Sequence, residues 1–244
     1  MSGAVTAIVP CMTLGDRPFV REAVQSIRDQ TEPCEIIVVV EESNDWIETT
    51  LAGIPNIRIM RIPLSPPGPT RNAAVAEART EFVAFLDADD VWLPNKTAVQ
   101  LEFLRKRKAD FVGVDHTLMR EDGTVFAYGT AKYIPMPSGW MVRRDFMLRF
   151  PFRDKFGGES ADDAMWWRDT EKKTERHRIA EHLVKYRVRT VSVSSEHWSK
   201  QKKLRFANMS RVPLARPLLL VGSYVVHFIN RRTHYVPFVD RRSH

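Results

Sequence analysis

Short apolar runs alternate with amphipathic segments over the first half of the chain. Five runs have the length and β-branched content of buried strands: VTAIVP (5–10), EIIVVV (35–40), IRIMRI (57–62), EFVAFL (81–86) and DFVGVD (110–115). The segments between them predict helices at 16–30, 70–79 and 94–108, with Asp16 capping the first. Strands that alternate with helices indicate an α/β fold with a mainly parallel sheet and helices on both faces.

Polar and acidic residues follow the ends of three predicted strands. Pro10 to Thr13 follow the first strand, Glu41 and Glu42 the second, and Asp87 and Asp89 the fourth. In parallel sheets of this kind, ligands bind at the carboxyl ends of the strands. We therefore expect the binding site at this edge.

The stretch FLDADD (85–90) places the carboxylates of Asp87, Asp89 and Asp90 within four positions. This crowding is costly because each negative charge disfavours the ionised form of its neighbours. Alternate residues of an extended segment project to the same side, so Asp87 and Asp89 can converge on one Mg²⁺ or Mn²⁺ ion. A solvated acidic turn that caps the helix near Pro94 explains the triplet equally well when it is taken alone.

Composition narrows the partners without choosing one. The chain has 244 residues, 43% of them hydrophobic, and a formal net charge of +7, which favours anionic partners such as nucleotides, phospholipid surfaces or nucleic acid. Two cysteines, Cys11 and Cys34, are too few for a disulfide scaffold. The start MSGAVTAIVP lacks the features of a signal peptide, so we expect a cytoplasmic protein, either free or peripheral to a membrane.

The longer stretch TRNAAVAEARTEFVAFLDADDVWLPNK (70–96) favours the metal interpretation. With Gly68 before it, it resembles the central signature of family-2 glycosyltransferases, which have the GT-A fold. EIIVVVEESND (35–45) resembles the family's second element, with Glu41-Glu42-Ser43-Asn44 where Asp-Asp-Gly-Ser is usual. VTAIVPCMT (5–13) resembles the opening strand and the nucleotide-binding turn. The resemblance covers roughly residues 4–200.

This resemblance implies a donor site for a nucleotide-diphospho-sugar. It implies that Asp89 is the direct ligand of Mn²⁺ or Mg²⁺, and that Asp87 lies near the ribose or a metal-bound water, with Ala88 between them. The residues implied to hold the nucleoside are Pro10, Thr13, Glu42 and Arg71. From the residues alone, Arg71 also fits a surface position on a helix, Thr13 a turn and Glu42 a turn cap.

The stretch FGGESADDAMWWRD (156–169) resembles the family's acceptor-side motif, in which an acidic pair opens a helix. The resemblance implies Asp163 as the base that deprotonates the acceptor hydroxyl, with Asp162 in support. It also implies that Gly158 lies beneath the sugar and that Trp166 is an acceptor platform. The alternatives are that both aspartates only cap the helix and that the tryptophans pack in the core.

A later stretch, VSVSSEHWSKQKKLRF (191–206), follows this motif. In several family members a histidine placed here completes the metal shell or contacts the diphosphate, which implies one of these roles for His197. Lys203 and Arg205 belong to a basic run that is expected to contact the departing pyrophosphate. A lone histidine is also compatible with a structural role.

The segment VPLARPLLLVGSYVVHFI (212–229) is strongly apolar but contains Arg216 and Pro217. Its uninterrupted part, 218–229, has 12 residues, whereas a membrane-spanning helix needs about 20. We expect 212–244 to pack on the domain or to form a homo-oligomer contact, with contact to a membrane surface as the second interpretation. The basic residues of 230–244 leave nucleic acid binding open.

Together these features predict a GT-A domain over 1–205, with a nucleotide-sugar half (1–115) and an acceptor half (116–205), and a helical extension over 206–244. The predicted activity is metal-dependent, inverting transfer of a sugar, with UDP-sugars as the first choice of donor, to a hydroxyl on a glycan, lipid, protein or modified nucleobase. Two rival classes remain. One is a sugar nucleotidyltransferase, against which the few glycines of IVPCMTLGDRP argue; the other is a non-catalytic binding protein on a transferase fold.

Overall fold

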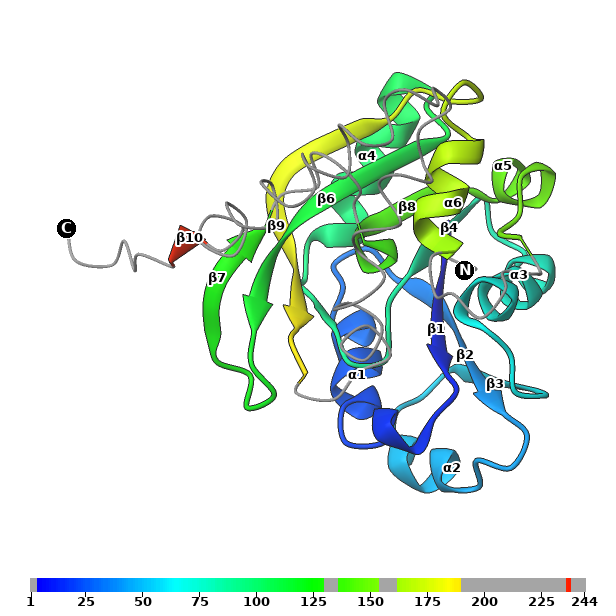
Figure 1. Ribbon diagram of the computed structural model, residues 1–244, viewed down its shortest axis with the longest axis vertical. Coiled ribbons are helices and arrows are strands. Elements are labelled where there is room, and N and C mark those ends of the chain that lie inside the picture. The colour runs from blue at the N-terminus through cyan, green and yellow to red at the C-terminus, as the bar shows by residue number, and fades with distance from the viewer. Residues whose placement is uncertain (1–3, 130–135, 154–161, 190–235, 238–244) are drawn as a thin grey trace, which may run out of the picture. The chain divides into compact units, whose positions relative to one another are not determined.

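The computed structural model describes residues 4–129, 136–153, 162–189 and 236–237. The chain forms two compact units, one comprising Met1–Thr117 and Thr130–Arg187, the other Leu118–Gly129 and Val188–His244. The expected site residues that are described all lie in the first unit, which is shown with the rest of the chain in Figure 1.

The first unit contains strands and helices in alternation. Its strands are β1 (Val5–Cys11), β2 (Cys34–Glu41), β3 (Ile57–Ile62), β4 (Phe82–Phe85), β5 (Val91–Trp92), most of β6 (Phe111–Met119), β8 (Trp140–Arg143) and β9 (His177–Arg187). Its α-helices are α1 (Val20–Arg28), α2 (Trp46–Leu51), α3 (Pro67–Glu77), α4 (Lys96–Arg107), α5 (Arg144–Arg149) and α6 (Asp162–Asp169). Two short 3-10 helices, η1 (Leu14–Asp16) and η2 (Pro137–Gly139), complete it.

The central strands form a sheet in the order β6-β8-β4-β1-β2-β3. Strands β4, β1, β2 and β3 are parallel, whereas β8 pairs antiparallel with both β4 and β6. The short β5 pairs antiparallel with β9. The sheet is therefore mixed and mainly parallel, which confirms the predicted fold class.

Alternating side chains of the strands build two apolar layers, one on each face of the sheet. Val5, Ala7 and Val9 of β1 point to the layer that α1, α2 and α4 cover, whereas Ile8 points to the layer covered by α3, α5 and α6. Burial on both faces explains why the central strands are nearly continuous apolar runs.

The strand register brings three strand ends together. Cys11, the last residue of β1, lies opposite Val40 in β2, and Ile8 lies opposite Phe85 at the end of β4. The residues that follow β2 and β4, including Glu42 and Asp87, thus leave the sheet at the same edge as Met12 and Thr13.

The predicted strands and helices agree with these bounds, with two differences at helix starts. Helix α3 begins at Pro67 rather than at Thr70, because proline is suited to the first helical turn, where its missing N–H costs nothing. The predicted helix 16–30 is divided into η1 and α1, and the Asp16 carboxylate accepts hydrogen bonds from the N–H and hydroxyl of Thr13, at 3.1 and 3.2 Å. Asp16 therefore does not cap α1. The elements α2, β5, β8, α5 and β9 were not predicted from the sequence.

In the second unit, β7 (Val125–Gly129) pairs antiparallel with the two-residue strand β10 (Val236–Pro237). The backbone N–H of Val188 donates to the carbonyl of Met119, at 2.8 Å. The apolar segment 212–229 lies outside the described residues, so its predicted role is not tested. Among the helices that are described, none is long and apolar enough to span a bilayer.

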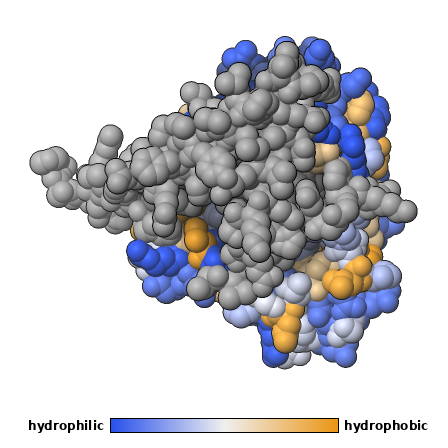
Figure 2. Space-filling model, viewed as in Figure 1, coloured by the Kyte–Doolittle hydropathy of each residue, from blue (hydrophilic) through white to orange (hydrophobic). Residues whose placement is uncertain are grey.

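On the face shown in Figure 2, hydrophobic residues form small patches among polar ones. Large exposed apolar side chains in the described ranges include Leu14, Leu64 and Leu148. Both cysteines, in contrast, are buried and unpaired.

A buried lysine makes folding sensitive to pH. Lys96 begins α4 with no exposed surface; its ammonium donates to Oε1 of Gln100, at 2.7 Å, and lies 3.9 Å from the ring centroid of Trp92. Burial lowers the pKa of Lys96 from 10.5 to about 7. In the unfolded chain the ordinary pKa returns, so between these values the unfolded state binds more protons. Lys96 therefore makes the free energy of unfolding increase as the pH rises from about 7 toward 10.5.

We predict that Lys96→Met removes this pH dependence. The free energy of unfolding of wild type should rise between pH 7.5 and 9.5 because of Lys96, whereas methionine does not titrate. The free energy of unfolding of the variant minus that of wild type should therefore fall by about 2 kcal/mol over this range. Urea unfolding of both proteins at the two pH values measures the difference. A stability difference that is the same at both pH values would contradict a lowered lysine pKa.

Candidate active site

The segment Asp87–Asp90 forms a tight turn directly after β4. The N–H of Leu86 still donates to the carbonyl of Ile8 in β1, at 3.0 Å, and the N–H of Asp90 closes the turn by donating to the carbonyl of Asp87, also at 3.0 Å. The three carboxylates of this turn lie in three different environments, which resolves much of the repulsion that their spacing implies.

Asp90 points into the protein and is fully buried. One of its carboxylate oxygens accepts the hydroxyl of Ser138 in η2, at 2.6 Å, and the other accepts the backbone N–H of Arg187 in β9, at 2.9 Å. Burial raises the pKa of Asp90 well above its usual range, and the charges of Asp89 and Asp87 raise it further. Ser138 also accepts the N–H of Asp87, at 3.1 Å, so Asp90 and Ser138 together fix the shape of the turn.

Asp87 is paired with Arg71 in α3. A guanidinium nitrogen of Arg71 lies 2.5 Å from the Asp87 carboxylate, and the side chains are 4% and 32% exposed. The guanidinium carbon also lies 5.8 Å from the ring centroid of Phe152. Arg71 is thus buried, contrary to the surface alternative, and one of its described contacts holds Asp87. Its expected contact with a nucleoside stays a prediction.

Asp89 is half-buried, and its backbone carbonyl accepts Nε of Arg187, at 2.8 Å. The Cys11 thiol is close by: burial is the main cause that raises its pKa, and the negative charges of Asp16 and Asp89 raise it further. The end of β1 therefore lies next to this turn. Ala88, between the two aspartates, is buried.

Asp87 and Asp89 have the chemistry of a hard divalent cation site. Both offer carboxylate oxygens and both are partly accessible, which fits an ion that binds through one or two carboxylates plus substrate phosphates. Among the described residues, no group of three or more histidine, cysteine, aspartate or glutamate side chains could hold a metal ion. Asp87 and Asp89 therefore fit a divalent cation that takes its remaining ligands from a bound diphosphate.

The expected nucleoside residues lie at the neighbouring strand ends. Pro10 is half-buried opposite Val39, and Thr13 is exposed at the start of η1. Glu42 is exposed; its N–H donates to the carbonyl of Ile62, at 3.0 Å, and its carbonyl accepts the Arg61 guanidinium, at 2.9 Å. These bonds fix the backbone that carries the Glu42 carboxylate.

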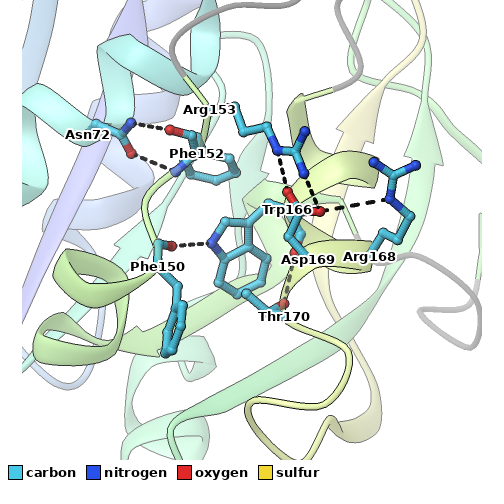
Figure 3. Close-up of polar contacts among 8 residues, drawn as sticks. All are labelled: Asn72, Phe150, Phe152, Arg153, Trp166, Arg168, Asp169 and Thr170. Atoms are coloured by element: carbon cyan, nitrogen blue, oxygen red, sulfur yellow. Dashed lines mark hydrogen bonds and ion pairs between the residues drawn. The ribbon is translucent and has the colours of Figure 1, made fainter.

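Asn72, directly after Arg71, connects α3 to the segment that leads toward α6 (Figure 3). Its amide donates to the carbonyl of Phe152, at 2.7 Å, and its amide oxygen accepts the Phe152 N–H, at 3.0 Å. The Phe152 ring lies 5.8 Å from that of Trp166 in α6. Two successive residues of α3 thus hold the acidic turn and the segment that leads toward α6.

Trp166 lies in the core. The side chain is 2% exposed, its indole N–H donates to the carbonyl of Phe150, at 2.7 Å, and its ring packs against Trp140 and Phe111, with centroids 4.9 and 5.9 Å away. So little of the ring is exposed that no face remains for an acceptor. This position favours the alternative that the tryptophan packs in the core over the expectation of an acceptor platform. Trp167 is half-buried and stacks against the Arg176 guanidinium, 3.9 Å from its ring centroid.

The acidic pair 162–163 opens α6, as the sequence predicts. Asp163 is half-buried in the first turn. At the other end of α6, Asp169 forms two hydrogen bonds with Arg153, at 2.5 and 2.7 Å (Figure 3). This ion pair ties the residues that precede 154–161 to the helix that follows them. Gly158, His197, Lys203 and Arg205 lie outside the described residues, so their predicted roles are not tested.

Two residues that fix the acidic turn escaped the sequence analysis. Arg187 ends β9, whose sequence HRIAEHLVKYR (177–187) alternates weakly, and this weak pattern is the signal that could have indicated a strand. Ser138 follows two prolines in an irregular stretch, and no local pattern identifies it.

The fold and the acidic turn at its strand ends define a glycosyltransferase of the GT-A class. The sequence profile described as Glycosyl transferase family 2 matches residues 6–169. The chain belongs to this family, as the resemblance of the acidic motif indicated.

Named relatives match this chain over different lengths. TuaG of Bacillus subtilis, whose name assigns it to teichuronic acid biosynthesis as a glycosyltransferase, is 30% identical over 224 residues, which is 83% of this chain and 86% of TuaG. The succinoglycan biosynthesis protein ExoW of Rhizobium meliloti is 34% identical over 100 residues, 38% of this chain and 31% of ExoW.

Solved structures share the fold. TarS 1–349 of S. aureus, crystallised with UDP-GlcNAc, superposes with a TM-score of 0.65 at 16% identity, covering 95% of this chain and 74% of that one. The mannosyltransferase PcManGT of Pyrobaculum calidifontis, in complex with GDP-Man and Mn²⁺, superposes with a TM-score of 0.64 at 16% identity, covering 92% and 70%.

We predict that Ser138→Ala destabilises the protein by about 2–3 kcal/mol, because it leaves an oxygen of the buried Asp90 carboxylate without its donor. The matched control is Thr170→Ser, which keeps a buried hydroxyl on the Trp166 carbonyl, 2.8 Å away in wild type, and deletes only a methyl group. Chemical denaturation measures both. Equal stability of Ser138→Ala and wild type would show that the Ser138 hydroxyl does not support the acidic turn.

Proposed function

We propose that this glycosyltransferase moves a sugar from a nucleotide-diphospho-sugar, in the first instance a UDP-sugar, to a hydroxyl acceptor, with inversion and with Mn²⁺ or Mg²⁺. The observation that carries the proposal is the acidic turn. Asp87 and Asp89 remain partly accessible on a turn that Asp90, Ser138 and Arg71 hold in place at the carboxyl edge of the sheet.

The donor half of the proposal rests on neighbouring strand ends. Residues after β1 and β2, with Thr13 and Glu42 exposed among them, provide polar groups for a nucleoside beside the turn. Asp89, with Asp87, would hold the divalent ion. When bound, that ion neutralises charge on the leaving diphosphate and orients it. Arg71 keeps Asp87 oriented for this role.

The acceptor half rests on the connection from α3 to α6. Arg71 and Asn72 contact Phe152, Phe152 packs on Trp166, and Trp166 lies one helical turn after Asp163. These contacts hold α6, which carries Asp163, next to α3, whose Arg71 contacts the acidic turn. Asp163 would take the proton of the acceptor hydroxyl as general base, with Asp162 in support. The oxygen then forms a bond to the anomeric carbon as the bond to the diphosphate breaks, and the electron pair leaves with the diphosphate.

The names of the relatives support a glycan acceptor. TuaG and ExoW are both named for the biosynthesis of bacterial polysaccharides. We therefore place a sugar hydroxyl of a growing polysaccharide ahead of a protein, lipid or nucleobase acceptor. The contact of 212–244 with a membrane, a second subunit or nucleic acid stays a prediction from the sequence.

A donor panel tests the proposed activity. We expect release of UDP or GDP from at least one UDP- or GDP-sugar in the presence of Mn²⁺, and loss of that release in excess EDTA, restored by adding Mn²⁺. The loss should be about tenfold or more, because the ion supplies charge stabilisation at the leaving group. Absence of both binding and release for every donor, with metal present, would favour a non-catalytic binding protein.

Substitutions of single aspartates separate the proposed roles. Asp89→Asn should weaken Mn²⁺-dependent UDP binding by about tenfold or more, since a ligand carboxylate loses its charge. Asp163→Asn should leave UDP binding within about twofold and lower kcat by about 100-fold or more, since the general base is lost. Calorimetry and initial rates measure the two effects.

Asp145→Asn, on the exposed surface of α5, is the matched control and should change neither quantity. Equal loss of donor affinity in Asp89→Asn and Asp163→Asn would refute the division between metal ligand and base.

A further inference from the structure

Arg187 contacts the acidic turn from a strand that is far from it in sequence. It is the last residue of β9, and its side chain is 2% exposed. Its backbone N–H donates to the Asp90 carboxylate, at 2.9 Å, and its Nε donates to the Asp89 carbonyl, at 2.8 Å. One residue of β9 therefore holds two consecutive residues of the turn.

The guanidinium of Arg187 is itself held by α1 and the residue before it. The Glu22 carboxylate lies 2.5 Å from a terminal nitrogen, and the guanidinium carbon lies 4.7 Å above the ring centroid of Phe19. The Glu22 side chain is 54% exposed, whereas that of Arg187 is 2% exposed, so the Arg187 side chain has less freedom to move than the Glu22 side chain. The planar guanidinium can donate in fixed directions to Asp89 and Glu22 at once, which the single ammonium of a lysine cannot reproduce.

We propose that Arg187 is a positioning residue of the donor site that fixes the Asp89 peptide, so that the Asp89 carboxylate is presented in one orientation. This inference rests on the proposed function, in which Asp89 is the ligand of the divalent ion. A held carbonyl restricts the backbone torsions on both sides of the Asp89–Asp90 peptide. Fewer torsions of Asp89 then have to be ordered when the ion binds, which lowers the entropic cost of binding.

A purely structural role would give a different result. In that case Arg187 would only join α1 to β9. Its loss would lower the stability of the whole fold and would not speed amide exchange in the acidic turn more than elsewhere. Arg178, also in β9, provides the comparison. It forms two hydrogen bonds with the buried Asp115, at 2.8 and 2.5 Å, and its contacts within the described part of the chain do not include the acidic turn.

The test compares Arg187→Lys, Glu22→Gln and Arg178→Lys with wild type by two measurements. Hydrogen exchange of the apoprotein follows the Asp90 amide, which closes the turn on the Asp87 carbonyl. Electron paramagnetic resonance then gives the Mn²⁺ affinity in the presence of UDP, and calorimetry gives the UDP affinity in EDTA.

We expect Arg187→Lys to speed exchange of the Asp90 amide by about tenfold or more and to weaken Mn²⁺ binding by about tenfold or more, as loss of an outer-shell partner does. UDP binding in EDTA should stay within about twofold, because the nucleoside contacts are untouched. Glu22→Gln, a substitution at an exposed site that should fold normally, should change both in the same direction by about threefold. Arg178→Lys should change neither.

The proposal would be overturned if Arg187→Lys left both the exchange of the Asp90 amide and the Mn²⁺ affinity unchanged. If Arg187→Lys does not fold, the same result in Glu22→Gln would overturn it. Equal effects of Arg178→Lys would also overturn it, because they would show a general loss of stability. A wild type that binds no UDP with Mn²⁺ would refute the proposed function instead. The hydrogen exchange would still show whether Arg187 orders the turn.

Discussion

Mutual repulsion among three carboxylates at the end of β4 is the constraint on which this site depends. The protein meets it by giving each carboxylate a separate environment. Asp90 is buried with hydrogen-bond donors from η2 and β9, Asp87 is paired with Arg71, and Asp89 stays half-buried at the surface. Negative charge is thus reduced enough for the turn to fold, yet enough remains at the sheet edge to attract a divalent cation.

The start of α3 organises both halves of the proposed reaction. Arg71 faces Asp87, and Asn72 holds both backbone groups of Phe152, which packs in the same aromatic cluster as Trp166. A helix packed against the sheet can place two adjacent polar residues more rigidly than a loop can. This rigidity gives a physical reason for an arginine and an asparagine at the first turns of a helix that is otherwise rich in alanine.

The roles of arginine and tryptophan side chains were harder to predict from the sequence than the positions of the apolar strands. The family resemblance implies a nucleoside contact for Arg71 and an acceptor platform for Trp166, but it carries no information on how deeply either side chain is buried. Both side chains proved to be buried, where Arg71 neutralises a neighbouring carboxylate and Trp166 fills the space between α6 and the sheet. The sequence does not reveal which face of a helix is covered when aromatic and polar residues occupy both faces.

The sequence by itself determined the four parallel strands β1 to β4, the start of β6, the helices α1, α3 and α4 and the acidic turn, because strand burial on both faces and turn chemistry are local and leave a periodic pattern. It also indicated the family, through spacings within single motifs. Only the tertiary structure decided how the carboxylates are divided among Arg71, Ser138 and Arg187. Those partners lie 16, 48 and 97 residues away from the carboxylates they contact, and contacts at such separations depend on packing that no local pattern records.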